Sequence, residues 1–256
     1  MKYIDIHAHL DFPDFNKDRD ILINDMLSKS IGAFNIGTSL ETSQNSISLA
    51  EKYKNIWAVV GIHPSYVFQS RIEELDLIEK MILHPKCVAI GECGMDLFRA
   101  ADDKETKDNQ VRFFEKQIEQ AIKYNKPLMI HCREAYPETL DILESFKKTN
   151  PNLHAHFHFF TESIDTARKV LDNNFTLSFT GPITFANYDD LIRFVPIDSI
   201  MVETDAPYAA PKSVRGQRSD PRHILEIGEK ISQLKKISEE DLFEQIKKNV
   251  TRIFGI

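Results

Sequence analysis

The nine residues Met1 to His9, with the sequence MKYIDIHAH, are the stretch on which the interpretation of this chain depends. Their alternation predicts a β-strand, in which successive side chains point to opposite faces, so that Asp5, His7 and His9 share one face. Two imidazoles two residues apart on one strand face can bind the same metal ion. On its own, this pair is weak evidence for a metal site, because a chain with nine histidines can contain such a pair by chance. The interpretation therefore depends on the residues that follow.

Short apolar strands and amphipathic helices alternate along the rest of the chain. After the first strand, we expect strands at residues 33–36, 56–61, 87–91, 127–130, 153–157, 175–179 and 200–202. We expect helices at residues 18–29, 41–53, 72–83, 109–124, 136–146, 163–171, 188–194 and 221–233. Ser238 is predicted to cap one more helix, which would follow the last unit of the pattern.

Eight apolar strands that alternate with helices predict a parallel sheet covered on both faces, and eight strands close into a (β/α)8 TIM barrel. An open, doubly wound sheet is the alternative architecture. No composition break or low-complexity tract marks a linker, and such barrels often span about 250 residues. We therefore expect one domain over residues 1–256, of α/β class, with an extra C-terminal helix.

The net charge of −7 argues against a protein that holds nucleic acid by bulk electrostatic attraction. It is compatible with an enzyme that binds phosphates locally through metal ions and a few arginines. Three cysteines and the absence of a secretion signal favour a reducing cytoplasm. No apolar run approaches the roughly 18 residues of a membrane span. We expect a cytoplasmic monomer without membrane association.

Residues with reactive side chains follow the expected strands, where a barrel places its active site around one mouth. They are His7, His9, His63, Glu92, His131, His154, His156, His158, Glu203 and Asp205. A single histidine at a strand end is more often a hydrogen-bonded wall residue than a metal ligand. Together, however, these groups would be costly to desolvate unless a cation paired with them. A pair of divalent ions is the simplest such cation.

Several short motifs, taken in order, resemble the TatD family of metal-dependent deoxyribonucleases, in the metallo-dependent hydrolase superfamily. They are DIHAH at 5–9, GIHP at 61–64, GECGMD at 91–96, IHCR at 130–133, SFTGP at 178–182, ETDAPY at 203–208 and RG at 215–216. The resemblance covers essentially the whole chain. It implies a (β/α)8 barrel of the metallo-dependent hydrolase type and a two-metal hydrolase.

The resemblance also implies which residues bind the metal ions. His7, His9 and Asp205 would bind one ion, His131 and a strand-six histidine the other, and Glu92 would bridge them. His158 fits the family pattern of the sixth strand, although Glu162 stands where the family usually has glycine. His156 remains the alternative, since it shares a strand face with His158.

Mixed imidazole and carboxylate ligands suit Mg²⁺, Mn²⁺ or Zn²⁺ and do not choose among them. Two such ions about 3.5–4 Å apart could bind the scissile phosphate and activate a water molecule. We assign Glu92, Asp205 and Glu203 to the catalytic group. Asp205 would orient or deprotonate the water, and Glu203 would support the ligands from the same strand face.

Five further residues are expected to contact substrate: His63, Arg99, Arg133, Arg215 and Arg218. An arginine fork matches the geometry of phosphate oxygens. Arg133 is the strongest of these predictions because it follows the expected ligand His131 by two residues. After His63 and Pro64 the chain has Ser65, where the family commonly has a second histidine.

The leading functional hypothesis is a metal-dependent phosphodiesterase that trims single-stranded DNA from the 3′ end, with DNA as a transient partner. One alternative is an amidohydrolase-type or ester hydrolase on the same scaffold, including one that deacylates misacylated tRNA. A lysine at the end of the fourth strand would favour that alternative, but Glu92 stands there. A non-catalytic binding protein would lack ligands, and none is missing from the motifs.

Overall fold

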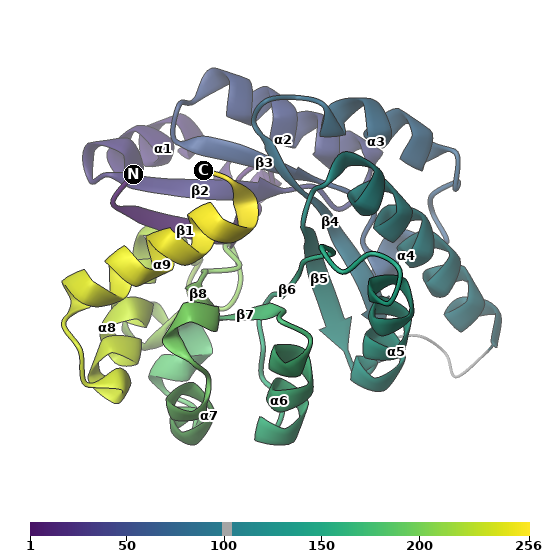
Figure 1. Cartoon of the computed structure of the whole chain (residues 1–256). Helices are drawn as coiled ribbons and strands as arrows, with labels where there is room; N and C mark the ends of the chain where they lie inside the picture. Colours follow the sequence, from purple (N-terminus) through teal and green to yellow (C-terminus); the bar gives the residue numbers. More distant parts are fainter. Residues whose placement is uncertain (99–103) are drawn as a thin grey trace.

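Eight parallel strands pair in chain order in the computed structural model, which describes residues 1–98 and 104–256. They are β1 (Tyr3–Ala8), β2 (Ile31–Ile36), β3 (Ile56–Val60), β4 (Cys87–Asp96), β5 (Leu128–Arg133), β6 (Ala155–Phe157), β7 (Thr176–Phe179) and β8 (Ile200–Val202). A parallel bridge between Ala8 and Ala206 brings the first and last strands together, so that the sheet curves into a nearly closed barrel (Figure 1). The predicted (β/α)8 barrel is confirmed, and the open doubly wound sheet is wrong.

Helices surround the strands on the outside of the barrel (Figure 1). They are α1 (Arg19–Ser28), α2 (Leu40–Lys52), α3 (Glu74–Ile82), α4 (Lys104–Tyr124), α5 (Tyr136–Lys147), α6 (Ile164–Asp172), α7 (Asp189–Phe194), α8 (Ile224–Lys235) and α9 (Glu239–Phe254). None of the helices in the described ranges is long and apolar enough to cross a membrane.

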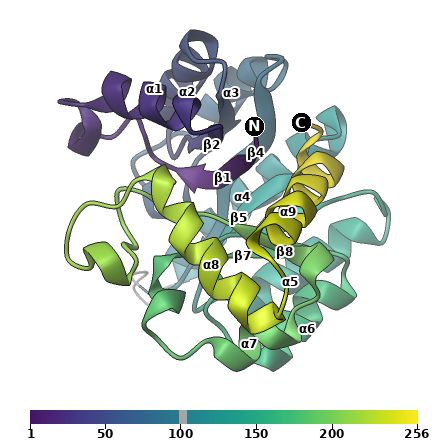
Figure 2. The same ribbon diagram turned by 90° about the vertical axis from the view of Figure 1, so that its left-hand side faces the viewer.

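The extra C-terminal helix, α9, begins where the sequence predicts it. The Ser238 hydroxyl accepts a hydrogen bond from the backbone N–H of Asp241 at 3.0 Å, which satisfies one of the free donors of the first turn. Leu242, Ile246 and Val250 are buried beneath the helix. Helices α8 and α9 lie side by side across one flank of the barrel (Figure 2).

The seam between β1 and β8 is held by a buried carboxylate. Asp5 accepts hydrogen bonds from the backbone N–H of Thr204 at 3.0 Å and from its hydroxyl at 2.5 Å. One residue further on, the N–H of Asp205 donates to the carbonyl oxygen of His7 at 2.9 Å. These bonds bring residues from β1 and from the segment after β8 into one group at the mouth of the barrel.

Replacing Asp5 by alanine is expected to lower the free energy of unfolding by about 1–3 kcal/mol, because two buried donors on Thr204 would lose their acceptor. Urea denaturation followed by circular dichroism would measure the change. Asp5→Asn keeps one carbonyl oxygen in place and should cost less. Equal stability of Asp5→Ala and the unmodified protein would contradict this role for the seam.

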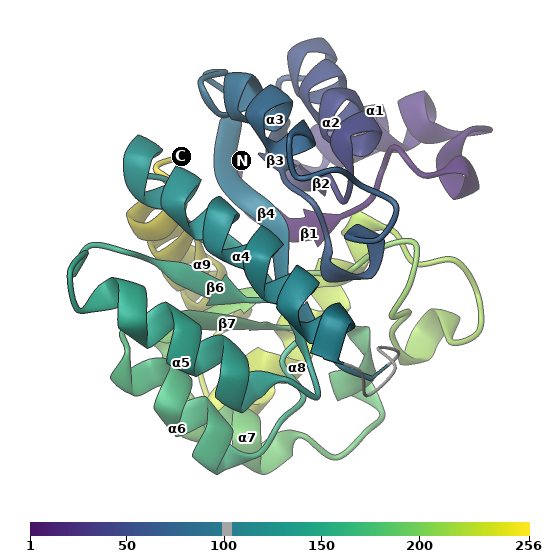
Figure 3. The same cartoon turned by 90° about the vertical axis from the view of Figure 1, so that its right-hand side faces the viewer.

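Two glutamines on α4 hold the ends of neighbouring strands. The Gln117 side chain accepts from the N–H of Ile62 at 2.9 Å and donates to its carbonyl oxygen at 3.1 Å. Gln110 makes the same pair of bonds, both at 2.9 Å, with the backbone of Asp96. Because α4 lies along the outside of β4 (Figure 3), it fixes the segments that carry His63 and Asp96.

Candidate active site

Glu92 reaches the centre of the barrel mouth because β4 and β5 approach each other closely. The flanking Gly91 and Gly94 have φ angles of 147° and 130°, in a region that side chains disfavour. A Cβ atom on Gly94 would collide with the carbonyl oxygen of His131, and one on Gly91 with that of Met129. The two glycines therefore allow the contact that places Glu92, which is 3% exposed, beside His131.

The two carboxylate oxygens of Glu92 face two different sets of histidines. Oε2 lies 3.5 Å from Nε2 of His7 and 3.9 Å from Nε2 of His9. Oε1 lies 2.9 Å from Nε2 of His158 and 3.0 Å from Nδ1 of His131. One carboxylate thus stands between two groups of nitrogen donors, which is the arrangement that a bridging ligand requires.

The first group consists of His7, His9 and Asp205, whose ligand atoms all lie within 4.8 Å of one another. Oδ1 of Asp205 is 3.5 Å from Nε2 of His9 and 3.8 Å from Nε2 of His7. Burial disfavours the ionised form of Asp205, but hydrogen bonding to His9 and the nearby imidazoles outweigh it, and its pKa lies below its ordinary value. The carboxylate is therefore ionised at neutral pH.

The chemistry of this group fits a divalent cation. Neither ring nitrogen of His7 has a hydrogen-bond partner among the described residues, although the side chain is fully buried. An unpaired buried nitrogen is costly, and a metal ion at Nε2 would satisfy it. The pKa of Glu92 also lies well below its ordinary range, since four surrounding histidines overcome the effect of its burial. Glu92 and Asp205 therefore both present negative charge to His7 and His9.

Two candidate ligands are held in a definite orientation by the ring nitrogen that faces away from the cavity. Nδ1 of His9 lies 3.2 Å from the carbonyl oxygen of Ile36. Nε2 of His131 lies 3.0 Å from Oδ2 of Asp96. In each neutral ring the proton then resides on the anchored nitrogen, so that the lone pair of the other nitrogen faces Glu92.

Sequence reasoning did not single out Asp96 as a functional residue. The alternation of β4 contained the signal, because residues two and four positions apart on a strand share a face, and Asp96 follows Glu92 by four. The expected strand ended at residue 91, whereas β4 continues to Asp96. The structure thus adds Asp96 to the candidate site as the residue that orients His131.

Glu203 lies behind the histidines and does not line the cavity. Its Oε2 is 3.8 Å from Nδ1 of His7, and its Oε1 is 3.7 Å from Nδ1 of His158. Oε1 also accepts a hydrogen bond from the N–H of Phe159 at 2.5 Å. Since it is fully buried and faces the far side of two candidate ligands, Glu203 is placed to orient them.

The structure distinguishes the two histidines that sequence spacing left open. Both ring nitrogens of His156 are bound, at 2.8 Å each, by the hydroxyls of Thr176 and Ser178. Burial holds the pKa of His156 well below its ordinary value, so the ring is neutral in the barrel interior. His158 instead directs Nε2 toward Glu92. This geometry favours His158 as the ligand from the sixth strand.

His63 also reaches Glu92, with Nε2 at 3.4 Å from Oε1. Its ligand atom lies within 4.8 Å of those of Glu92 and His131, so the three could form a metal site by distance alone. However, Nδ1 of His63 accepts a hydrogen bond from the N–H of Ser65 at 3.0 Å. In the neutral ring the proton is therefore on Nε2, which makes His63 a hydrogen-bond donor toward the site.

All the candidate ligands except the fully buried His7 line a cavity of about 780 Å³ at the mouth of the barrel. Its walls come from the loops that follow the strands. The lining residues are His9, Phe12, Thr38, His63, Ser65, Tyr66, Glu92, His131, Cys132, Arg133, His158, Phe159, Thr161, Pro182, Tyr188, Asp205 and Tyr208. The cavity is large enough for a nucleotide-sized group.

The predicted arginines differ in their surroundings. Arg133 lines the cavity. Arg215 is exposed in the loop between β8 and α8. Arg218 is not brought into the site, because its guanidinium binds the carboxylate of Asp18 at 2.5 and 2.8 Å. Arg218 thus connects the loops after β8 and β1. Arg99 lies outside the described residues.

A family model described as TatD related DNase matches residues 4–255 of the chain. The chain belongs to the TatD family of metal-dependent hydrolases. As a member of the TatD family, it is an enzyme that hydrolyses ester bonds, and its candidate site contains groups that can hold metal ions.

Relatives of this TatD-family chain match over nearly its full length. It is 32% identical to an uncharacterized metal-dependent hydrolase, YabD, of Bacillus subtilis, with 98% of each chain covered. It is 30% identical to the 3′–5′ ssDNA/RNA exonuclease TatD of Citrobacter koseri, again with 98% of each covered. The crystal structure of YjjV, a TatD homologue from Escherichia coli, matches with a TM-score of 0.90 at 24% identity, covering 100% of this chain and 98% of that one.

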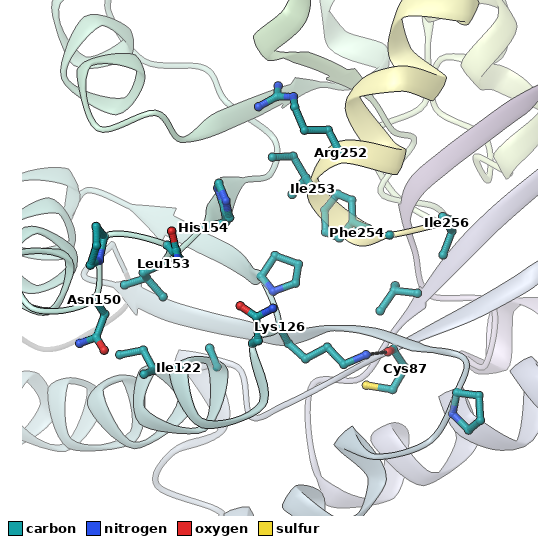
Figure 4. Close-up of a pocket in the computed structure, with 18 of the residues that line it drawn as sticks. Cys87, Ile122, Lys126, Asn150, Leu153, His154, Arg252, Ile253, Phe254 and Ile256 are labelled. Carbon is teal, nitrogen blue, oxygen red and sulfur yellow. Dashed lines mark hydrogen bonds between the residues drawn. The ribbon is translucent and has the colours of Figure 1, made fainter.

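A second cavity, of about 860 Å³, lies at the opposite end of the TatD-family barrel (Figure 4). His154 lines it together with Lys126 and Arg252, and Lys126 donates to the carbonyl oxygen of Cys87 at 2.6 Å. The sequence interpretation that put His154 at the mouth was wrong, because β6 begins at Ala155 and the histidine precedes it. Although this cavity is larger, the clustered histidines and carboxylates lie at the other end, where barrel enzymes carry out their chemistry.

Proposed function

We propose that the chain is a two-metal phosphodiesterase that removes nucleotides from the 3′ end of single-stranded DNA. The observation that carries the proposal is the division of the Glu92 oxygens between two histidine groups. The name of the Citrobacter koseri relative, a 3′–5′ ssDNA/RNA exonuclease, supports the choice of substrate.

In this proposal His7, His9 and Asp205 hold one divalent ion and His131 and His158 hold the other, with Glu92 shared between them. The ions, Mg²⁺, Mn²⁺ or Zn²⁺, would supply Lewis acidity and lower the pKa of a water molecule.

The protein groups would position and activate the reactants. Asp205, ionised and at the edge of the cavity, accepts the proton of the attacking water. Nε2–H of His63 donates a hydrogen bond to an oxygen of the scissile phosphate. Arg133 binds a further phosphate oxygen. Glu203 and Asp96 keep three of the histidines in the orientation that these contacts require.

The proposal includes DNA as a transient partner, a monomeric enzyme and a cytoplasmic location. A net charge of −7 gives little long-range attraction for a polyanion, so substrate contacts would be confined to the mouth of the barrel. The cysteines Cys87, Cys93 and Cys132 are all free thiols, as a reducing compartment favours.

The proposed activity can be tested with protein purified without chelator, after its metal content has been measured. A substrate panel would comprise single-stranded and duplex DNA, RNA, small esters and misacylated tRNA, each with Mg²⁺, Mn²⁺ and Zn²⁺. We expect stepwise shortening, from the 3′ end, of single-stranded DNA and of duplexes with a single-stranded 3′ overhang, each labelled at its 5′ end. Turnover of esters or misacylated tRNA without any cleavage of oligonucleotides would overturn the proposal.

Replacing His63 by alanine is expected to lower kcat by about 10²-fold, because it removes one hydrogen-bond donor aimed at developing charge. The number of bound ions should stay the same, since the proton on Nε2 excludes His63 from the ligands. Metal analysis and steady-state kinetics on the same preparation would separate the two effects. Loss of one ion from His63→Ala would show instead that His63 is a ligand.

A further inference from the structure

Exposed aromatic side chains occur only around the mouth of the barrel in the ranges that the structure describes, 1–98 and 104–256. They are Tyr66, Phe68, Phe98, Phe185 and Tyr208, which are between 38% and 58% exposed. All five lie in the loops that follow β3, β4, β7 and β8. Large apolar rings are normally buried, so a group of exposed rings beside a cavity indicates a binding surface.

Two of these rings connect to histidines of the site, Tyr208 through Phe12 and Tyr66 directly. The Phe12 ring stacks on His9 with centroids 4.6 Å apart, and Tyr208 meets Phe12 edge-on at 6.3 Å. On another side, Tyr66 lies 6.2 Å from His63. Both tyrosines line the cavity. A phosphate held at the site would therefore place its neighbouring bases beside aromatic rings.

Two other rings each have the guanidinium group of an arginine stacked on them. The guanidinium of Arg133 lies 3.6 Å from the centroid of Phe98, and that of Arg215 lies 4.3 Å from Phe185. Neither arginine has a carboxylate partner within the described part of the chain. An arginine stacked on a ring keeps its N–H groups free for phosphate oxygens. Tyr208 and Arg215 both belong to the long loop between β8 and α8 (Figure 2).

We propose that Tyr66, Phe98, Phe185 and Tyr208, here called the aromatic rim, form a base-stacking surface that holds the unpaired bases next to the scissile phosphate. The proposal rests on the proposed function and adds the means by which the enzyme selects its substrate. An unpaired base offers both of its faces to the rim, whereas a base in a duplex is covered by its neighbours. Every base has such a face, so the rim recognises single strands with little regard to sequence.

The rim also accounts for how an acidic protein can hold a polyanion. Stacking does not depend on counterion release, whereas phosphate contacts do. With Arg133 and Arg215 as the cations of the rim, affinity for an oligonucleotide should fall only shallowly as salt is raised. A steep dependence, typical of six or more phosphate contacts, would contradict a surface dominated by stacking.

The direct test is binding of a fluorescent single-stranded oligonucleotide, measured by anisotropy without added metal so that no turnover occurs. The comparison strand has the same phosphates but abasic sugars at its three 3′-terminal positions. We expect the unmodified enzyme to bind the normal strand about tenfold or more tightly than the abasic one. Tyr208→Ala and Phe98→Ala should each reduce this ratio, and Tyr208→Phe should retain it.

Leu83→Ala provides a matched control, because Leu83 is 70% exposed but lies just before β4 begins, away from the mouth. Its ratio should equal that of the unmodified enzyme. Equal affinity of the unmodified enzyme for normal and abasic strands would overturn the proposal that the aromatic rim stacks on bases. Absence of cleavage with every metal would instead count against the proposed function, and the binding ratio would still decide the role of the rim.

Discussion

Glu92→Gln is expected to lower kcat on a labelled single-stranded oligonucleotide by about 10³-fold or more, with fewer than two divalent ions bound per chain. The substitution keeps the shape of the side chain and removes its charge. Since each oxygen of Glu92 faces a different histidine group, both groups lose the anion that they share. Single-turnover kinetics and metal analysis of the same sample would measure the two effects.

A suitable control for this variant is Glu115→Gln, on the exposed face of α4, which should leave both measurements unchanged. The histidines around Glu92 also need a counter-charge when the fold forms, so circular dichroism must first show that Glu92→Gln is folded. Undiminished cleavage by a folded Glu92→Gln protein that holds two ions would remove the bridging role from the proposal.

Asp205→Asn is expected to lower kcat by about 10²–10⁴-fold, because the amide cannot accept the proton of the attacking water. It should also weaken one ion, since one anionic oxygen is lost from the group that contains His7 and His9. Raising the metal concentration distinguishes the two effects. Occupancy should recover at high metal, whereas kcat should stay low.

Asp172→Asn, at the exposed end of α6, is the matched control for Asp205→Asn. If Asp205→Asn regained full activity at saturating metal, Asp205 would be a ligand without a role in proton transfer. If Asp205→Asn bound both ions normally and remained active, Asp205 would be neither a metal ligand nor the proton acceptor.

The sequence predicted most strands and helices to within a few residues, because the alternation of short apolar segments with amphipathic helices is strong. The expected end of β4 was wrong. Gly91 and Gly94 interrupt an apolar pattern and suggest a turn, whereas in the barrel they allow two strands to approach. That early end also concealed Asp96, whose position on the strand becomes informative only when β4 is known to continue.

Motif spacing identified the residues that gather around Glu92 but not the part that each plays there. The orientation of His63 depends on a backbone N–H two residues away, and that of His131 on a carboxylate from a different strand. Arg218 is a further residue whose role could not be predicted from spacing. The sequence does not reveal that its guanidinium forms an ion pair with Asp18, 200 positions earlier. These distinctions arise from contacts across the barrel.

The seam between β1 and β8 has a consequence for the order in which the enzyme becomes competent during synthesis. His7 and His9 are made before their partner Asp205, which is added about 200 residues later, as the separation of 199 positions between Asp5 and Thr204 reflects. Until the eighth strand has left the ribosome and docked, the first ion has no complete set of ligands. We therefore expect an unfinished chain to be inert toward DNA, and hydrolysis to begin only when the two ends of the barrel meet.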